Sequence, residues 1–464
     1  MLVFVYSTDA ASGRANISQE RPGVSSVFYR DLGHEYPVAV RGEGMYLYSE
    51  SGDQYLDMSG GAAVSCLGHG NKAVVAAVRD QIGSLAFAHT AFFTNKSQEA
   101  LAERLASRFG EKGARIYFTS GGSEANETAL KLVWQYWEAL GSAEKTIVIS
   151  RQFSYHGNTL GALSVTGNLS RRAHYERLLY DWPRISPCYA YRHQNAGESD
   201  DEYGLRAAGE LEQAIEKIGA ENVAAFIAEP VVGASLGAVP PVDNYFREIR
   251  RICDKHDVLL IADEVMCGCG RTGSFFAHEQ DDVLPDIVTM AKGLGGGYQP
   301  IAATLSRGHI ADNIASLPGG FTHGHTYIGH ATACAAGVAV QKCLDEQDLL
   351  SNVVSMGHEF FGVLQSALGD HPNVGDIRGR GLFAGIEVVA DRETKEPFPA
   401  EDELAPRLKA AAMDARLICY PAAGSVDGKR GAHIMLAPPF IVETQHLDEL
   451  AGKLGTIFDT VFNT

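Results

Sequence analysis

The chain has 464 residues, enough for two or three domains of ordinary size or for one large domain with extensions. Hydrophobic residues make up 45% and charged residues 21%, which is typical of a globular protein and argues against a disordered, collagen-like or coiled-coil chain. The formal net charge of −18 disfavours nucleic acid and anionic membranes as partners, so an anionic ligand must be held by backbone N–H groups or a few placed cations.

No apolar run is long enough to cross a membrane, since runs such as residues 258–262 fall far short of the roughly 20 residues required. The apolar start, residues 1–6, is brief and has no basic residue before it, unlike a secretory signal peptide, so a cytoplasmic protein is expected. Most of the eight cysteines have apolar neighbours and are interpreted as reduced core residues. Cys267 and Cys269 form the only close pair, and without a second pair at ligand spacing no metal site is predicted.

In chain order, residues 38–43 and 44–56 look like hairpin strands, with a turn at 51–53. From residue 115 onward, short β-branched or aromatic runs alternate with stretches of helical periodicity. The expected strands are 115–119, 146–150, 223–228, 258–262 and 287–290, and the expected helices include 124–137, 210–218 and 242–256. This alternation predicts an α/β fold with a mostly parallel sheet sandwiched by helices, in which ligands bind at the carboxyl ends of strands.

Other segments complete this organisation. The polar residues 192–203 are expected to form a surface loop, and residues 382–389 and 433–436 look like strands among helices. We therefore expect a smaller α+β domain built from both chain ends. Its N-terminal segment would be residues 1–70, the large domain residues 71–340, and its C-terminal part residues 341–464.

Three of the expected strands end in residues that carry chemistry. Asp263 follows one buried run, where a carboxylate needs a cationic partner. Lys292 follows another and precedes a glycine-rich turn; burial lowers the pKa of such an amine, which helps it attack a carbonyl and form a Schiff base. The segment Ser-Gly-Gly-Ser-Glu-Ala-Asn at 120–126 follows a third strand and opens a helix, an arrangement that cradles phosphate.

An amine, an acid and a phosphate cradle are together what pyridoxal phosphate requires for its aldehyde, its ring nitrogen and its phosphate. Each of the three by itself is more often structural. A lysine before glycines is usually a solvated helix start, an aspartate after a strand is usually a helix cap, and Ser-Gly-Gly-Ser is usually only a turn. Their occurrence together on an alternating α/β chain predicts pyridoxal phosphate as the cofactor.

From about Tyr36 to its end, the chain resembles the class III aminotransferases, which belong to the fold type I pyridoxal-phosphate enzymes. The resemblance rests on the segments 120–126, 155–157 (Tyr-His-Gly), 228–231 (Ala-Glu-Pro-Val), 263–273, 291–293 (Ala-Lys-Gly), 323–327 (His-Gly-His-Thr-Tyr) and 437–440 (Ala-Pro-Pro-Phe). These segments are highly specific for the family and weakly specific for the substrate.

The resemblance implies a role for each residue around the cofactor. Lys292 would form the internal aldimine and later move the substrate's proton, and Asp263 would pair with the pyridinium nitrogen. Gly122 and Ser123 would donate N–H groups to the phosphate. Further cofactor contacts are implied for Tyr155 and Val265 on the two ring faces, for Glu229 near the phenolic oxygen, and for Thr326 at the phosphate of the neighbouring subunit.

Some of these residues have a structural alternative. Tyr155 could be a core tyrosine, Glu229 could simply end a strand, and Thr326 could be a helix cap. Because Thr326 would contact the phosphate of a neighbouring subunit, its role implies a homodimer with shared active sites, or a dimer of such dimers.

Substrate choice depends on a few pocket residues. The carboxylate of an oxo acid favours an arginine fork, which in related enzymes lies a little upstream of the Pro-Pro pair. The aligned position here is Gly428, so Arg430 is the candidate, and a solvated basic loop is the alternative. Phe87 and Phe93 are expected to line the substrate pocket across the dimer, and the small residues at 60–63 to make it roomier.

The predicted function is transfer of an amino group from an ω-amino acid, diamine or amine to pyruvate or 2-oxoglutarate. A phospho-lyase, aminomutase or racemase of the same family would use the same lysine without needing an oxo acid. A dinucleotide-binding oxidoreductase is disfavoured, because the glycine run at 293 continues with Tyr298 where glycine or alanine is required.

Overall fold

The computed structural model describes residues 25–462, so the expectation for residues 1–6 lies outside the described range. The chain divides into two compact units, Met1–Val38 and Ala39–Thr464. Residues 25–38, the described part of the first unit, contain no helix or strand, and in them the rings of Tyr29 and Tyr36 lie 5.1 Å apart. The second unit contains the functional residues discussed below.

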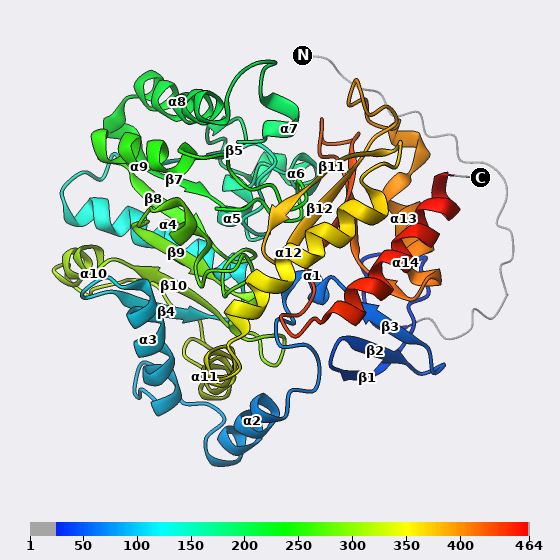
Figure 1. Ribbon diagram of the computed structural model, residues 1–464. Coiled ribbons are helices and arrows are strands. Elements are labelled where there is room, and N and C mark those ends of the chain that lie inside the picture. The colour runs from blue at the N-terminus through cyan, green and yellow to red at the C-terminus, as the bar shows by residue number, and fades with distance from the viewer. Residues whose placement is uncertain (1–24, 463–464) are drawn as a thin grey trace, which may run out of the picture. The chain divides into compact units, whose positions relative to one another are not determined.

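A seven-stranded sheet lies at the centre of the second unit (Figure 1). Its strands, in spatial order, are β4 (Arg115–Thr119), β10 (Ala302–Ser306), β9 (Ile287–Met290), β8 (Leu259–Asp263), β7 (Val223–Ala228), β5 (Ile147–Arg151) and β6 (Arg184–Ile185). β10 runs antiparallel to both of its neighbours, and the remaining pairs are parallel. The expected mostly parallel sheet is therefore confirmed.

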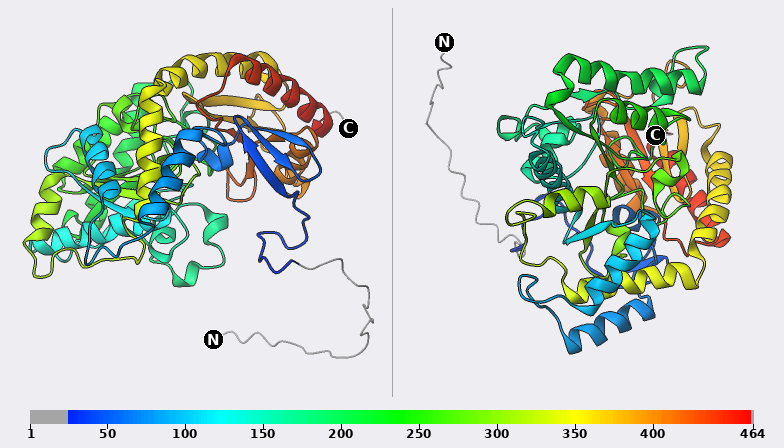
Figure 2. Two further views of the ribbon diagram at one scale, coloured as in Figure 1. Left: turned by 90° about the horizontal axis from the view of Figure 1, so that it is seen from below. Right: turned by 90° about the vertical axis from the view of Figure 1, so that its left-hand side faces the viewer.

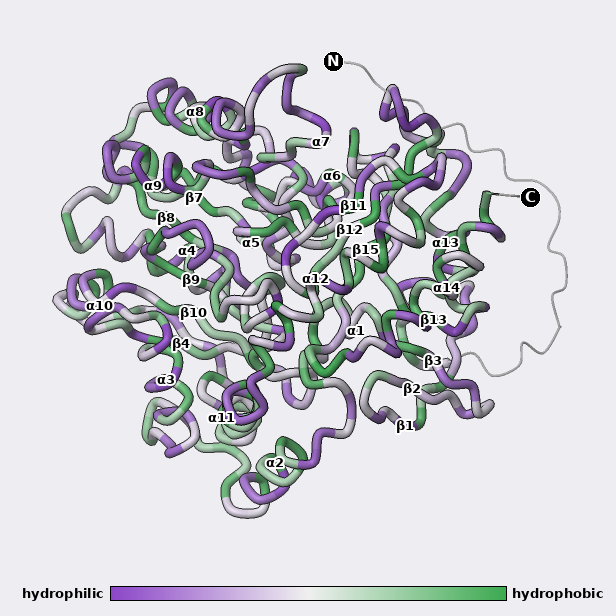
Figure 3. The backbone as a smooth tube through the Cα atoms, in the orientation of Figure 1, coloured by the Kyte–Doolittle hydropathy of each residue, from purple (hydrophilic) through white to green (hydrophobic). Residues whose placement is uncertain are grey.

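Helices cover both faces of this sheet (Figure 2). Alternate residues of a strand point to opposite faces, so Phe226 of β7 packs with the apolar residues of α8 (Asp200–Ile218) and α9 (Tyr245–Lys255). Its neighbour Ile227 packs with α4 (Gly122–Ala139) and α10 (Gly308–Ala315) instead. Every residue of β7, β8 and β9 is buried, which explains their continuous apolar sequences. Figure 3 shows this as hydrophobic colouring along the central strands.

The expected surface loop at 192–203 is partly wrong. A short helix, α7 (Ala190–His193), includes its first two residues, and α8 already begins at Asp200. Ser199 and Glu202 form a capping box, and Asp200 and Asp201 complete an acidic first turn. The polarity that suggested a loop is instead what stabilises the start of a helix.

Strands near the chain ends form two smaller sheets, and one of these sheets combines both ends. One contains β1 (Ala39–Glu43), β2 (Tyr46–Ser49), β3 (Gln54–Asp57) and β13 (Leu417–Ile418); the other contains β11 (Val374–Arg380), β12 (Phe383–Val388), β15 (Ala432–Leu436) and β14 (Tyr420–Ala423). β3 and β13, far apart in sequence, pair in parallel. This pairing agrees with a small domain made from both ends, whose boundaries at residues 70 and 340 stay a prediction.

The remaining helices connect and cover these sheets. They are α1 (Gly60–Ala63), α2 (Lys72–Ser84), α3 (Lys96–Phe109), α5 (Leu160–Val165), α6 (Leu169–Arg172), α11 (Ala331–Glu346), α12 (Leu349–Leu368), α13 (Leu404–Asp414) and α14 (Thr444–Phe462). One apolar cluster runs from α3 and α11 through α12 to α14 and β12. Among residues 25–462, no helix is both long and apolar enough to span a membrane.

Candidate active site

Lys292 opens a short 3-10 turn, η4 (Lys292–Leu294), directly after β9 and Ala291. Its φ of +44° is unusual for a residue with a side chain. The residue is half-buried, and desolvation lowers the pKa of its amine, while the nearby Asp263 carboxylate is the main influence that raises it. Within residues 25–462 the amine forms no hydrogen bond or ion pair. This is an amine prepared to act as a nucleophile or a base.

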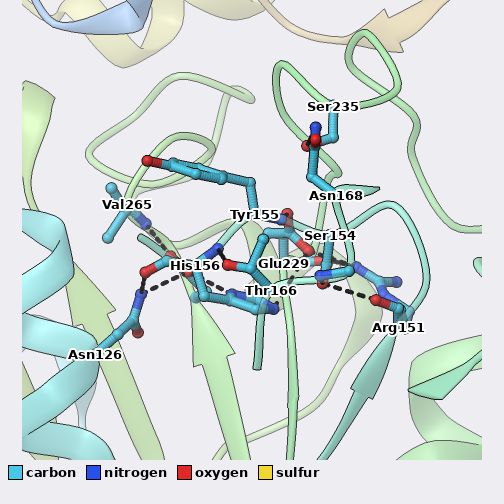
Figure 4. Close-up of polar contacts among 12 residues, drawn as sticks. Asn126, Arg151, Ser154, Tyr155, His156, Thr166, Asn168, Glu229, Ser235 and Val265 are labelled. Atoms are coloured by element: carbon cyan, nitrogen blue, oxygen red, sulfur yellow. Dashed lines mark hydrogen bonds and ion pairs between the residues drawn. The ribbon is translucent and has the colours of Figure 1, made fainter. Parts of the chain in front are cut away.

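Asp263 is the last residue of β8 and is only 2% exposed. Its Oδ2 lies 2.7 Å from Nδ1 of His156 and accepts a hydrogen bond from Nδ2 of Asn126 at 2.9 Å (Figure 4). Its Oδ1 accepts from the backbone N–H of Val265 at 3.0 Å. Both carboxylate oxygens are thus held, so the orientation of the acid is fixed.

Asn126, on α4, ties this carboxylate to the rest of the site. Its amide nitrogen donates both to Asp263 and to the carbonyl of His156, the latter at 2.6 Å. Its amide oxygen accepts from Oγ1 of Thr289 at 2.9 Å. The side chains of Asn126, His156 and Thr289 are all buried, so each of these bonds is shielded from water.

Glu229, just after β7, is held by two protein groups. Its Oε1 accepts from the backbone N–H of Tyr155 at 3.0 Å, and its Oε2 lies 3.3 Å from Nη2 of Arg151. Arg151, at the end of β5, is 2% exposed and also donates to the backbone carbonyl of Glu229. Glu229 is therefore the buried partner of an arginine, and its contact with the phenolic oxygen of the cofactor stays a prediction.

The phosphate cradle forms where α4 begins at Gly122. A Cβ on Gly122 would lie 2.8 Å from Cγ1 of Val265, so only glycine lets the helix start approach the end of β8 so closely. Ser123 follows, and its Oγ accepts from the backbone N–H of Asn158 at 3.2 Å. The start of an 18-residue helix with small residues and close backbone is suited to an anion.

Tyr155 and Val265, the two residues expected to pack on the cofactor ring, lie at the same end of the sheet. Figure 4 shows the ring of Tyr155 extending toward Val265, above His156. Tyr155 is 36% exposed, so it is at the entrance of the site and is not a core tyrosine.

The small residues at 60–63 form α1, in which φ is positive at every position, between 53° and 70°. A Cβ on Gly61 would meet no atom within 4 Å. Gly61 is itself exposed, and the expectation of a roomier pocket stays a prediction.

Phe87, Phe93 and Thr326 lie in a separate, exposed aromatic region of the chain. The ring centroid of Phe87 lies 5.5 Å from that of Tyr327 and 5.7 Å from that of His330. Phe93 is 67% exposed, and Thr326 is also exposed. Within the described residues, no hydrogen bond, ion pair or ring contact joins them to Lys292 or Asp263.

This aromatic region nevertheless reaches the phosphate cradle. A cavity of about 220 Å³ is lined by Ser120, at the start of the cradle, and by Tyr327 and His330. Thr119 also lines it, with a buried hydroxyl that has no hydrogen-bond partner among the described residues. An additional polar group can therefore be accommodated beside the cradle.

Arg430, the candidate for carboxylate binding, is exposed in the turn between β14 and β15. Its Nε donates to Oδ2 of Asp427 at 2.8 Å and its Nη1 to Oε1 of Glu396 at 3.2 Å. The hydrogen bond to Asp427 is the main cause of the raised pKa of this guanidinium. The structure thus pairs Arg430 with two acids, and its role toward a substrate stays a prediction.

Sequence reasoning missed two partners in this site. Asn126 was part of the cradle motif but had no role assigned, although a polar side chain on the inner face of a helix signals a buried hydrogen bond. Arg151 ends an apolar strand, and a cation at that place could have indicated the partner of Glu229.

Comparison with known proteins gives one family. The family model described as Aminotransferase class-III matches residues 29–458. An uncharacterized aminotransferase of Schizosaccharomyces pombe is 44% identical over 442 residues, covering 94% of this chain and 95% of that protein. A chloroplastic gamma aminobutyrate transaminase 3 of Solanum lycopersicum is 38% identical over 426 residues, covering 90% of this chain and 79% of that protein.

A solved structure of a transaminase has a similar fold. The omega transaminase of Pseudomonas jessenii, determined in complex with PMP, superposes with a TM-score of 0.86 at 34% identity, covering 92% of this chain and 93% of that one.

The residues present fit pyridoxal phosphate. The amine of Lys292 suits its aldehyde, the fixed carboxylate of Asp263 suits its ring nitrogen, and the glycine-lined start of α4 suits its phosphate. The predicted family, fold class, cofactor and transaminase activity are confirmed. The chain belongs to the class III aminotransferases, which are pyridoxal-phosphate-dependent transaminases of fold type I.

Proposed function

We propose that this transaminase moves an amino group from an ω-amino acid, diamine or simple amine to pyruvate or 2-oxoglutarate. The observation that carries the proposal is the unpaired amine of Lys292 beside the carboxylate of Asp263, whose two oxygens are both held. The names of the relatives, a gamma aminobutyrate transaminase and omega transaminases, support donors whose amino group is at the end of a chain.

Pyridoxal phosphate, when bound, supplies an aldehyde that takes up the amino group and a ring that withdraws electrons from the substrate carbon. Lys292 holds the cofactor between turnovers and moves the proton at the substrate carbon. Its lowered pKa makes the neutral, basic form of the amine available nearer to neutral pH.

Asp263 balances the positive charge of the protonated ring nitrogen. His156 and Asn126 keep its carboxylate aligned for that contact. Gly122 and Ser123 donate backbone N–H groups to the phosphate, and Tyr155 and Val265 pack on the two faces of the ring. Glu229 orients the backbone of Tyr155 through the hydrogen bond to its N–H.

We further propose a homodimer, or a dimer of such dimers, in which each subunit completes the other's site. Phe92, Phe93 and Tyr327 are 80%, 67% and 61% exposed, and an exposed aromatic surface of this kind marks an interface. Thr326 would reach the partner's phosphate, and Phe87 and Phe93 would line the partner's substrate pocket. The eight cysteines are all free thiols and seven are buried, which supports a reducing, cytoplasmic location.

A substrate panel tests the proposed reaction. Purified holoenzyme would be incubated with 4-aminobutanoate, 1,4-diaminobutane or 1-phenylethylamine, each with pyruvate, with 2-oxoglutarate and without an oxo acid. We expect many turnovers that yield alanine or glutamate only when the oxo acid is present. Turnover without an oxo acid would instead identify lyase, mutase or racemase chemistry.

Light scattering tests the proposed homodimer. It should give a mass of two or four chains, and a monomeric active enzyme would contradict the shared site.

A further inference from the structure

The entrance beside Tyr155 is framed by the short helix α6 (Leu169–Arg172). Its N-cap residue Asn168 accepts from the backbone N–H of Arg171 at 3.2 Å and donates to Oγ of Ser235 at 3.2 Å (Figure 4). Just before it, the backbone N–H of Gly167 donates to the carbonyl of Ser154 at 3.0 Å. α6 is therefore fixed to the loop that carries Tyr155.

Arg171 extends from this helix over Tyr155. The central carbon of its guanidinium lies 6.0 Å from the centroid of the Tyr155 ring. Arg171 is exposed, and within residues 25–462 its side chain forms no ion pair and no hydrogen bond. Its five N–H donors are thus available to a ligand.

The neighbouring Arg172 shows the opposite behaviour. It is 2% exposed and donates to the carbonyls of Leu163, Ser164 and Thr166, and it also pairs with Glu176 at 2.9 Å. Arg172 has a structural role that the local backbone explains completely. No such role accounts for Arg171.

Arg430 lies two residues after Gly428, in another segment. The turn that carries it packs on α6, because a Cβ on Gly428 would lie 2.9 Å from Cβ of Leu169. Two arginines therefore flank one region, but Asp427 and Glu396 already engage Arg430. On a chain with a net charge of −18, an unengaged cation at the entrance is the group that can attract a carboxylate.

We propose that Arg171 binds the carboxylate at the end of the substrate remote from the transferred nitrogen. The proposal rests on the proposed function, in which Lys292 and Tyr155 border the reacting end. Lys292 is half-buried and Arg171 is exposed, so a substrate extending from one to the other leaves its far end at the guanidinium. Arg171 thereby selects ω-amino acids over amines, and dicarboxylic over monocarboxylic oxo acids.

A pair of substrates that differ only in the carboxylate tests this selection. For 4-aminobutanoate and butylamine, kcat/KM would be measured with the wild type, R171Q, R430Q and R177Q. Arg177, in the nearby short helix η1 (Glu176–Leu178), is also exposed and unpaired within residues 25–462, so R177Q controls for the loss of one positive charge. We expect R171Q to lower the ratio of the two kcat/KM values about tenfold or more, through KM for 4-aminobutanoate, and R177Q to leave it unchanged.

Damage to the fold would lower both rates together, so the ratio separates recognition from stability. R171K, which keeps the charge without the fork, should retain part of the ratio. The proposal is overturned if R171Q leaves the ratio unchanged, or if R430Q lowers it and R171Q does not.

A binding measurement keeps the test independent of turnover. Glutarate has two carboxylates and neither an amino nor an oxo group, so calorimetric titration of holoenzyme measures recognition alone. We expect R171Q to raise its Kd about tenfold relative to the wild type and R177Q. Equal Kd values in R171Q and the wild type, or no binding to the wild type, would overturn the role of Arg171. A wild type that binds glutarate but transfers no amino group would instead contradict the proposed function.

Discussion

The protein contains two sets of charged groups that are held in different ways. Asp263 and Glu229 are 2% and 5% exposed, and each has both carboxylate oxygens bonded to protein groups. Arg171 and Arg430 are exposed, the first unpaired within the described residues and the second in surface ion pairs. Buried bonds fix geometry, whereas exposed charges rearrange at little cost. We infer that the buried set performs the chemistry common to all substrates and that the exposed set decides which substrates enter.

Replacing the lysine should have the largest effect. Lys292→Ala removes the amine that holds the cofactor and moves the proton, so kcat for transamination should fall by more than about a thousandfold. Lys217→Ala, at an exposed position of α8, is the control and should be fully active. Wild-type rates in Lys292→Ala, with an unchanged circular dichroism spectrum in both variants, would contradict the assignment of the site.

Replacing the buried Asp263 should have the second largest effect on kcat. Asp263→Asn keeps the shape of the side chain but removes the charge that balances the ring nitrogen. The loss of such a buried charge partner, about 3 kcal/mol, should lower kcat about a hundredfold. The matched control is Asp286→Asn. Asp286 lies directly before β9 and is also buried, but it pairs with Arg250. If both variants lose activity equally, the effect of Asp263 is one of stability.

The hydrogen bonds around Asp263 should contribute mainly to stability. Asn126→Ala leaves the buried carbonyl of His156 and the buried hydroxyl of Thr289 without a partner and removes one of the hydrogen bonds to Asp263, so the free energy of unfolding should fall by about 2–3 kcal/mol in urea titrations. Thr289→Val removes only one of these bonds and should cost about 1 kcal/mol. Equal stability of Asn126→Ala and the wild type would show that the network does not hold the acid in place.

The last effect appears only at acidic pH and concerns a buried histidine away from the reacting groups. Burial lowers the pKa of His433 to about 4, from an ordinary value near 6.5, with Glu387 opposing and Arg378 reinforcing the shift. Between these two values the unfolded chain binds a proton that the folded chain does not, so this group makes the protein lose stability as the pH falls from 6.5 to 4. Burial, not function, sets this dependence.

His433→Gln should therefore make the pH dependence of unfolding shallower by about 1 kcal/mol per pH unit in that range. His174→Gln, at an exposed position, is the control and should keep the wild-type slope. A wild-type slope in His433→Gln would contradict the neutral, buried state of His433.

Much of the fold could be predicted because its central strands are short apolar runs. The bounds of β4, β7 and β9 match the predicted ranges, since β-branched and aromatic residues begin and end together there. β10 was not predicted, because its sequence Ala-Ala-Thr-Leu-Ser carries little β preference and it forms a strand by pairing between β4 and β9. The start of α8 was missed because acidic capping residues resemble a polar loop.

The active site likewise contains residues that could be predicted from the sequence and residues that could not. Lys292 and Asp263 could be found because Asp263 ends one buried strand and Lys292 lies two residues after another, and these positions alone bring them to one edge of the sheet. The partners Arg151 and Asn126 had only weak sequence signals and were missed, because they lie on other elements and meet the site through tertiary packing. The ion pair of Arg430 with Glu396, 34 residues away, has no sequence signal, and so the alternative cation Arg171 was not considered.

The most direct test of the account is the visible absorption spectrum of the purified holoenzyme, recorded as an amine donor is added without an oxo acid and again after an oxo acid is added. If Lys292 and Asp263 support amino transfer, the donor should bleach the band of the bound cofactor, and pyruvate or 2-oxoglutarate should restore it. A band that no donor bleaches, or one that bleaches and returns without an oxo acid, would contradict amino transfer as the reaction of this site.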